Sequence, residues 1–224
     1  MLLLAIDTAT SAISVALHDG HRVLAETVTL DPRRHAEHLA PGIQRALADA
    51  GCSVADVTAV VAGVGPGPFT GLRVGLVTAR TLAFARGIPL YGVCSLDALA
   101  HQAWAERKED LGESFLVATD ARRKEVYWAP YTVTADGPRR TEGPAVAKPS
   151  DLVEQGAGRV VVGRGPLLYP DLLGAGLPPL DVSAGHLAAV AASALGRGEE
   201  LLPADPLYLR RPDAAPSAGR KPVL

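Results

Sequence analysis

The 224-residue sequence has little cysteine, no excess of either charge and no long hydrophobic run. Its two cysteines, Cys52 and Cys94, stand far apart, which excludes a disulfide framework and a Cys-x-x-Cys metal site and favours a reducing compartment. The 22 basic and 24 acidic residues give a formal net charge of -2. A protein that coats nucleic acid by itself normally carries a basic excess, so we expect any role with nucleic acid to pass through a partner.

The apolar start of the chain, residues 1–6, is interrupted by Asp7. It is far shorter than the roughly 20 residues that cross a bilayer, and it lacks the basic segment of a secretory signal. Hydrophobic residues nevertheless make up 48% of the sequence, enough for a sizeable core. We therefore expect a globular cytoplasmic protein that does not associate with membranes.

The first half of the chain alternates strand and helix patterns. Strands are predicted at 2–6, 13–17 and 23–30, and Asp19-Gly20 is a hairpin signal between the last two. Together they predict an antiparallel meander. Apolar residues at helical spacing predict helices over 35–50 and 70–86. The remaining elements expected in this half are apolar strands at 57–62 and 88–93 and a helix that starts at an N-cap Ser95 and reaches Trp104.

A charged stretch at 106–110 marks the predicted boundary between two lobes, residues 1–105 and a smaller, more irregular one of residues 106–224. The alternation of strands and helices indicates an α/β fold. We expect the tail from Pro212 to be frayed. In the second lobe the patterns predict strands at 114–119, 125–133 and 159–162, a helix at 186–195, and loops or short elements in the Gly/Pro-rich segments 137–149 and 163–179.

A glycine- and proline-rich loop over residues 63–71 joins a predicted buried strand to a helix. The first N–H groups of a helix and its dipole favour an anion, and the glycines allow close approach. The loop is neither a Walker A motif nor a complete G-x-G-x-x-G, so a tight structural turn and a phosphate site both stay open. The end of the first strand could face this loop or satisfy its own turn amides. The candidate phosphate-binding residues are Asp7, Thr8, Gly65, Gly67, Thr70 and Gly71.

The predicted helix over 70–86 carries two apolar stripes on nearly opposite sides. One stripe, Leu72, Leu76, Ala79, Leu82 and Ala83, can pack on the sheet of its own lobe. The other needs a helix of this chain or of a partner, and its steps of three, four and three residues are typical of paired helices. Complete internal burial and an intersubunit four-helix bundle both stay open. The candidate interface residues are Leu39, Ile43, Val74, Val77, Thr81 and Phe84.

Four segments of the sequence resemble the TsaB family, also called YeaZ. They are residues 4–10 (LAIDTAT), 65–75 (GPGPFTGLRVG), 120–127 (DARRKEVY) and 206–210 (PLYLR), so the likeness spans nearly the whole chain. The resemblance implies a two-lobed actin-like ATPase fold, which is ribonuclease H-like, with a mixed sheet and helices in each lobe. It also makes Asp120 the counterpart of Asp7 in the second lobe, although pairing of Asp120 with nearby arginines is the alternative.

The resemblance further implies an accessory, non-catalytic subunit of the bacterial system that forms N6-threonylcarbamoyladenosine at position 37 of ANN-decoding tRNAs. TsaB-like proteins bind the catalytic relative TsaD and self-associate through the two helices named above, which favours the interface interpretation. The implied partners are therefore TsaD, the ATPase TsaE and, for the chain alone, a second copy, with tRNA contacted only through the complex. In TsaD a His-x-x-x-His pair holds a metal, whereas Ser95 and Leu99 stand at the matching positions here.

The sequence therefore predicts no catalytic residue, no metal and no cofactor, except for weak ATP or ADP binding. Three alternatives stay open: a small-molecule kinase of the same superfamily that uses Asp7 and the Gly65 loop, a nucleotide-sensing regulator, and a peptidase. The last lacks both the metal pair and a Gly-x-Ser-x-Gly elbow. His35 and His38 have a metal-binding spacing but no third ligand. The basic residues near the end, Arg210, Arg211, Arg220 and Lys221, could contact tRNA phosphates or simply be solvated.

Overall fold

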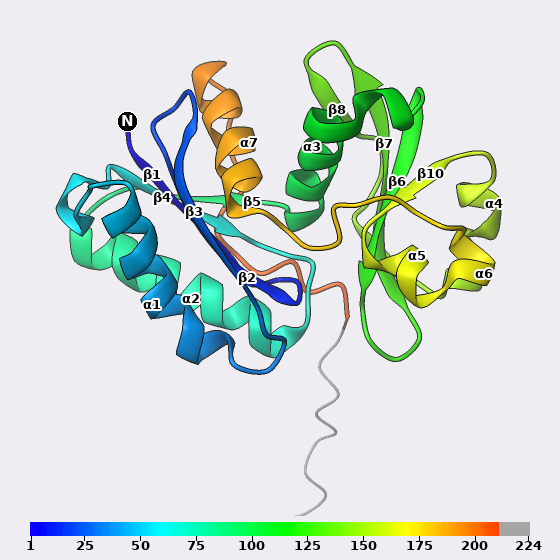
Figure 1. Ribbon diagram of the computed structural model, residues 1–224, viewed down its shortest axis with the longest axis horizontal. Helices are drawn as coiled ribbons and strands as arrows, with labels where there is room; N and C mark the ends of the chain where they lie inside the picture. Colours follow the sequence, from blue (N-terminus) through cyan, green and yellow to red (C-terminus); the bar gives the residue numbers. More distant parts are fainter. Residues whose placement is uncertain (211–224) are drawn as a thin grey trace, which may run out of the picture.

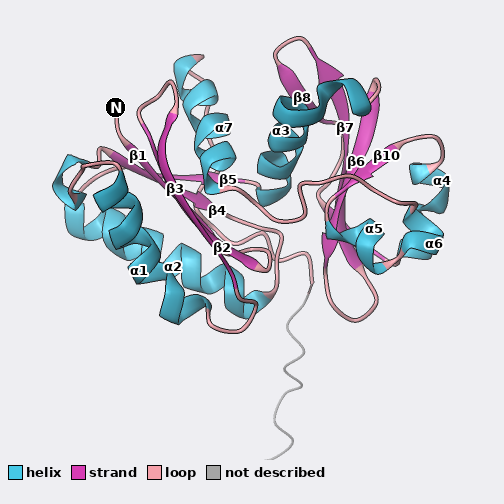
Figure 2. Ribbon diagram, viewed as in Figure 1, coloured by secondary structure: helices cyan, strands magenta, loops and turns pink. Residues whose placement is uncertain are grey.

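A computed structural model describes residues 1–210, which form two mixed sheets with helices outside and between them (Figure 1 and Figure 2). The predicted frayed tail and three of the basic residues near the end, Arg211, Arg220 and Lys221, lie outside the described residues. No helix in residues 1–210 is both long and apolar enough to cross a membrane.

The first sheet begins with the predicted meander, which is confirmed. Strands β1 (Leu3–Asp7), β2 (Ala12–His18) and β3 (Val23–Leu30) pair antiparallel, and β4 (Ala59–Gly63) and β5 (Leu90–Val93) run parallel to β1. The strand order is β3-β2-β1-β4-β5. β1, β2 and β4 are buried along their whole length, because helices cover both faces of the sheet, whereas the edge strand β3 is partly exposed.

One face of this sheet is covered by α1 (His35–Asp49) and α2 (Phe69–Arg86), both close to their predicted bounds. Their apolar residues Leu39, Ile43, Leu72 and Leu76 are buried against the strands. α2 ends at Gly87, whose φ of 62° is the left-handed cap that glycine favours. A short 3₁₀ helix, η1 (Val54–Asp56), precedes β4.

The second sheet has the order β10-β6-β7-β8, with β9 paired to β7. Its strands are β6 (Ser114–Asp120), β7 (Val126–Thr134), β8 (Gly137–Arg140), β9 (Ala145–Ala147) and β10 (Val160–Val162). Only β10 runs parallel to β6. The Gly/Pro-rich segments contain short elements rather than only loops. The helices on the outer face are η3 (Pro149–Leu152), α4 (Val153–Gly156), α5 (Arg164–Leu168) and α6 (Pro170–Leu173).

Two longer helices, α3 (Ser95–Arg107) and α7 (Ala184–Gly196), lie side by side between the sheets (Figure 1). α7 packs on β1 and β2, although it lies far along the chain, and α3 packs on the second sheet before leading into η2 (Lys108–Asp110). A single apolar core therefore joins residues of both sheets to these helices. Two histidines meet where α3 and α7 touch, with 2.9 Å between Nδ1 of His101 and Nδ1 of His186. The division between residues 105 and 106 stays a prediction. It assigned α3 to the first lobe and α7 to the second, whereas α3 packs on the second sheet and α7 on the first.

Residues 202–210, the C-terminal segment, run back over the first sheet and α2. The Gly92 N–H donates to the Leu202 carbonyl (2.7 Å), and the Leu207 N–H donates to the Val64 carbonyl (2.8 Å). At its end the Arg210 guanidinium donates to the Ala121 carbonyl (3.0 Å), beyond β6. The segment thus links the first sheet to the loop between β6 and β7.

Candidate functional site

Asp7 lies at the carboxyl end of β1 and is 1% exposed. One carboxylate oxygen, Oδ1, accepts a hydrogen bond from the Ala9 N–H (2.8 Å), and Oδ2 accepts one from the Ser95 hydroxyl (2.6 Å). The Ser95 hydroxyl in turn accepts from the Gly65 N–H (3.1 Å). Burial raises the pKa of Asp7 to about 6, although both hydrogen bonds oppose the shift. The carboxylate thus ties three segments of the chain together.

Ser95 was predicted as the N-cap of α3, and this prediction is wrong. Cys94 occupies the N-cap position with extended backbone, and Ser95 is the first helical residue. The Ser95 side chain is turned toward Asp7 and the Gly65 loop instead, with no exposed surface. Gly63 makes this contact possible, because a Cβ there would overlap the Asp7 carboxylate.

Thr8 fixes the start of α2 against β1. Its hydroxyl donates to the Gly71 carbonyl (2.7 Å) and accepts from the Gly75 N–H (3.0 Å). A Cβ at Gly75 would overlap this hydroxyl, so the helix approaches the strand as closely as it does because residue 75 has no side chain. The Gly65 loop is equally close to the turn after β1, since a Cβ at Gly67 would lie within van der Waals overlap of Ala9. The loop therefore acts as a tightly packed turn.

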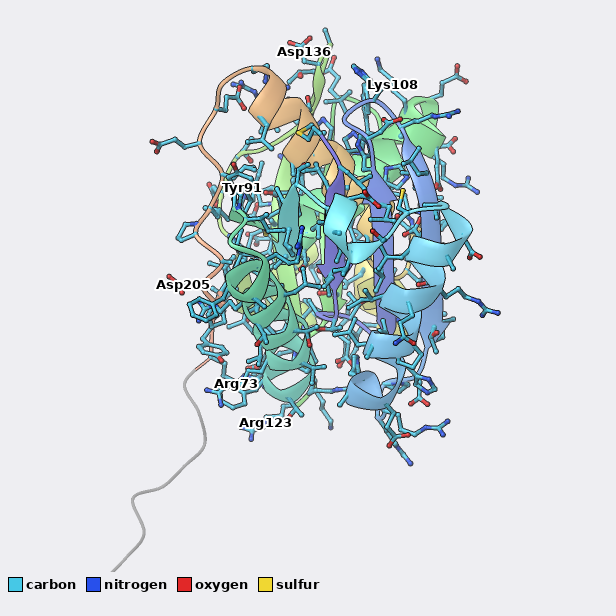
Figure 3. The ribbon with its side chains drawn as sticks, turned by 90° about the vertical axis from the view of Figure 1, so that its left-hand side faces the viewer. Arg73, Tyr91, Lys108, Arg123, Asp136 and Asp205 are labelled. Atoms are coloured by element: carbon cyan, nitrogen blue, oxygen red, sulfur yellow. The ribbon has the colours of Figure 1, made fainter. Side chains whose placement is uncertain are left out.

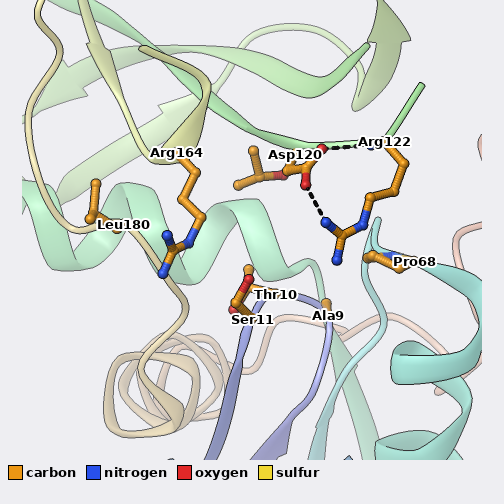
Figure 4. Close-up of a pocket in the computed structure, with 9 residues that line it drawn as sticks. Ala9, Thr10, Ser11, Pro68, Asp120, Arg122, Arg164 and Leu180 are labelled. Atoms are coloured by element: carbon orange, nitrogen blue, oxygen red, sulfur yellow. Dashed lines mark hydrogen bonds and ion pairs between the residues drawn. The ribbon is translucent and has the colours of Figure 1, made fainter. Parts of the chain in front are cut away.

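A small cavity lies between the two lobes, at the turn after β1 (Figure 4). Thr10, Ser11, Asp120, Arg122 and Arg164 are among its lining residues. Its volume of about 20 Å³ is enough for a single water molecule and far below the 300–1,000 Å³ of typical ligand pockets. Binding of ATP or ADP at this place would require the lobes to separate.

Arg164, which lines this cavity, forms an ion pair with Asp181. Arg164, at the start of α5, contacts Asp181 with two nitrogens, at 2.9 Å and 2.5 Å, and Asp181 also accepts from the Ser11 N–H (3.2 Å). No local sequence pattern predicts this ion pair, whose residues are 17 positions apart, or the contact of Asp181 with Ser11, which is 170 positions away. It ties the turn after β1 to the segment before α7.

The predicted phosphate-binding residues do not share one site. Asp120 lines the interlobe cavity and pairs with Arg122 (2.9 Å), which is the arginine pairing that the sequence analysis left open. Thr8, Thr70 and Gly71 line a second cavity and Gly67 a third, while Asp7 and Gly65 line none of the three. Whether any of these residues binds a phosphate stays a prediction.

The resemblance implies that positions 95 and 99 correspond to the metal ligands of the catalytic relative. Ser95 is engaged with Asp7, and Leu99 lies fully buried in the apolar core. The two other histidines of interest face different partners, since His35 Nε2 lies 3.2 Å from the Thr10 carbonyl and His38 Nε2 lies 3.4 Å from Asp31. Among residues 1–210, no group of three or more His, Cys, Asp or Glu side chains is placed to hold a metal ion.

The candidate interface residues divide into two groups. Leu39 and Ile43 are buried in the core between α1 and the first sheet, so they offer no surface to a partner, and their assignment to an interface is wrong. On α2 the second stripe faces outward: Val77 is 60% exposed, Phe84 is 90% exposed and Thr81 is exposed, while Val74 is half-buried. Complete internal burial of this stripe is therefore excluded. We call Val77, Thr81 and Phe84 the α2 face.

The chain is similar to several known proteins. Residues 22–169 match the family model of TsaD, tRNA N6-adenosine threonylcarbamoyltransferase. An uncharacterized protein of Mycobacterium tuberculosis is 47% identical over 96% of this chain and 94% of its own length. The tRNA threonylcarbamoyladenosine biosynthesis protein TsaB of Escherichia coli is 40% identical over 77% of this chain and 75% of its own length. The structure of YeaZ from Pseudomonas aeruginosa superposes with a TM-score of 0.78 at 32% identity, over 93% of this chain and 99% of that one.

The fold and the site define an actin-like, ribonuclease H-like protein whose central carboxylate is enclosed by its own chain. This confirms the fold class expected from the sequence. The chain belongs to the TsaB family, also called YeaZ.

Proposed function

We propose that this chain is a non-catalytic subunit that binds a TsaD-like catalytic relative through the α2 face and so supports formation of N6-threonylcarbamoyladenosine at position 37 of ANN-decoding tRNAs. The observation that carries the proposal is the exposure of Phe84, which is 90% exposed on a regular helix. It lies about one helical turn from Thr81 and two from Val77, which are also exposed. Large exposed apolar side chains grouped on one face are typical of protein interfaces.

Ser95 and Leu99 support the proposal that this subunit carries out no chemical step itself. A hydroxyl that is already hydrogen-bonded stands where the catalytic relative has a first metal ligand, and a buried Leu99 stands at the second. ATP turnover and carbamoyl transfer would therefore take place on the other subunits, TsaE and TsaD. The proposal places the protein in the cytoplasm, where these subunits modify tRNA, and lets the same face hold a second copy when the chain is alone.

The test replaces one side chain of the α2 face with a charged one. Phe84→Glu and Val77→Glu should each weaken binding to the catalytic relative by roughly 30-fold or more, as expected for a central apolar contact. Both residues are exposed, so thermal unfolding of the free protein should stay close to wild type. Leu167→Glu on α5 is the matched control, because Leu167 is as exposed as Val77 but lies on the outer side of the second sheet.

Binding is measured by co-purification with the tagged relative and by size-exclusion chromatography with light scattering, and the modified nucleoside is quantified in tRNA by mass spectrometry. We expect loss of the complex and of stimulated modification with the α2 variants and normal behaviour of Leu167→Glu. Normal complex formation by both α2 variants would refute the proposed interface.

A further inference from the structure

A third cavity, of about 400 Å³, opens beside the start of α2, where the C-terminal segment meets the loop between β6 and β7. We call it the Arg–Tyr pocket, because arginine and aromatic side chains line it. They are Phe69, Arg122, Arg123, Tyr127, Tyr208 and Arg210. Its volume is that of pockets that hold small molecules or single nucleotides. Pro68 and Arg122 separate it from the interlobe cavity, since these two residues line both.

Two exposed aromatic rings stand at this pocket. Phe69 and Tyr208 are each 40% exposed, with ring centroids 5.0 Å apart and ring planes inclined by 28°. Arg73 holds them: its guanidinium carbon lies 3.6 Å from the Phe69 ring centroid, and its Nε donates to the Tyr208 hydroxyl (2.7 Å). The rings are thus fixed at the surface instead of packing into a core. Exposed rings fixed next to arginines are typical of surfaces on which nucleic-acid bases stack.

The loop opposite these rings presents consecutive basic residues. Arg122, Arg123 and Lys124 have φ values of 60°, 52° and 60°, in the left-handed region that residues with a Cβ seldom adopt. The loop is closed by hydrogen bonds from the Ala121 N–H to the Glu125 carbonyl (3.0 Å) and from the Glu125 N–H to the Arg122 carbonyl (2.9 Å). It therefore holds three basic residues in a fixed backbone arrangement, and two of them, Arg122 and Arg123, line the pocket.

Among residues 1–210, cationic side chains outnumber carboxylates around the pocket. The basic residues are Arg73, Arg210 and the three of the loop. The carboxylates are Asp120, which pairs with Arg122, and Glu125, which pairs with Arg210. This local excess contrasts with the formal net charge of -2 for the whole chain. Figure 3 shows Arg73 and Arg123 at the same end of the molecule, close to where the C-terminal segment ends. A ligand with both an aromatic ring and negative charge fits these walls.

A neighbouring cavity favours a strand over a free nucleotide. It measures about 250 Å³, shares Pro68, Phe69 and Arg122 with the Arg–Tyr pocket, and is also lined by Arg33 and Thr70. Two adjoining cavities that share an aromatic and an arginine offer room for two consecutive units of a chain. Hydroxyl and guanidinium groups in the second cavity can bind the phosphate that joins them.

We propose that the Arg–Tyr pocket binds one nucleotide of a single-stranded RNA, with the base stacked against Phe69 and Tyr208 and the flanking phosphates paired with Arg122 and its neighbours. The choice of RNA over DNA rests on the proposed function, whereas the requirement for a base and a phosphate follows from the pocket. The sequence analysis expected this chain to contact tRNA only through its partners. The present proposal adds a direct contact.

The test measures binding of a fluorescein-labelled ten-nucleotide oligoadenylate RNA to the isolated full-length chain by fluorescence anisotropy at low salt. Tyr208→Leu should weaken binding about tenfold, as expected for one lost stacking contact, whereas Tyr208→Phe, which keeps the ring and loses only the hydrogen bond from Arg73, should retain most of the affinity. Arg122→Gln should weaken binding and reduce the slope of log K against log salt by about 0.7, the value for one phosphate of a single strand. Arg45→Gln is the matched control, because Arg45 is exposed on α1 and lines neither cavity.

Several outcomes would overturn the inference. They are absence of binding by the wild-type chain, wild-type affinity of both Tyr208→Leu and Arg122→Gln, or an equal loss with Arg45→Gln. Competition by AMP as effective as by the same concentration of decamer would reject the strand, and equal affinity for a DNA decamer would reject the selection of RNA. Because the assay contains no second protein, its failure would leave the complex with the catalytic relative untouched, and failure of that complex would leave this assay unaffected.

Discussion

Replacing Asp7 with asparagine tests how the buried carboxylate affects stability. The pKa of Asp7 is raised to about 6 from 3.8, mainly by burial, so between these pH values the native state binds more protons than the unfolded state. The free energy of unfolding therefore falls as the pH rises through this window. At 1.36 kcal/mol per pKa unit, the loss amounts to about 3 kcal/mol. Asparagine has nearly the same shape as aspartate but no charge, so the Asp7→Asn variant does not show this pH-dependent loss of stability.

The variant also has a cost of its own, because an amide nitrogen in place of Oδ2 cannot accept the hydrogen bond that the Ser95 hydroxyl donates there, a loss of about 1–3 kcal/mol. The informative quantity is therefore the difference in unfolding free energy between variant and wild type, from urea denaturation at pH 3.5, 5 and 7. This difference should rise by about 3 kcal/mol from the lowest to the highest pH. A difference that stays constant with pH would refute the buried, perturbed carboxylate.

Asp56→Asn provides a control of opposite sign. Hydrogen bonds from Ser53 lower the pKa of Asp56, so its carboxylate stabilises the native state above the ordinary pKa and this contribution disappears at low pH. The free energy of unfolding of Asp56→Asn should therefore fall further below that of wild type at neutral pH than at acidic pH. Asp7→Asn also separates two functions, because a kinase that used Asp7 as base or metal ligand would lose activity, whereas a non-catalytic subunit should still support tRNA modification with its partners.

Gly75→Ala should lower stability by about 1–3 kcal/mol in thermal unfolding, since its Cβ overlaps the Thr8 hydroxyl; Gly196→Ala, with open space around it, should not, and equal effects would contradict the close packing of α2 on β1. Burial lowers the pKa of His101 to about 4, so the unfolded state binds more protons between pH 4 and 6.5 and stability falls on acidification. His101→Gln should reduce this loss in urea denaturation at pH 4.5 and 7, and an unchanged loss would show that other groups cause it.

Much of the fold could be predicted because its signals are local. The meander follows from alternating apolar residues and from Asp19-Gly20, and the helical periods of α1 and α2 lie entirely within each segment. The position of α7 could not be predicted, since an apolar helix pattern does not tell which sheet the helix covers, and its contacts with β1 and β2 span most of the chain. The bidentate pair of Arg164 with Asp181 could not be predicted either, because no helix or strand period relates these two positions, which are 17 residues apart.

The candidate site shows the same limit at single residues. The spacing of Leu39 and Ile43 indicates an apolar face but not whether the covering surface is the chain's own sheet or a partner, and here it is the sheet. Ser95 fits the residue preference for an N-cap, yet its hydroxyl forms a stronger, charge-assisted bond to a carboxylate 88 residues away. Tertiary partners of this kind outweigh local preference and leave no trace in the neighbouring sequence.

The position of α7 has a consequence for how the protein is made. A ribosome releases β1 to β5 long before residue 196, so the face of the first sheet that α7 later covers stays bare while the second sheet is synthesised. In the nascent chain, the apolar face of the first sheet therefore stays exposed until α7 has been synthesised. Chaperones that recognise such surfaces would bind the unfinished polypeptide and lose this binding surface once α7 has emerged.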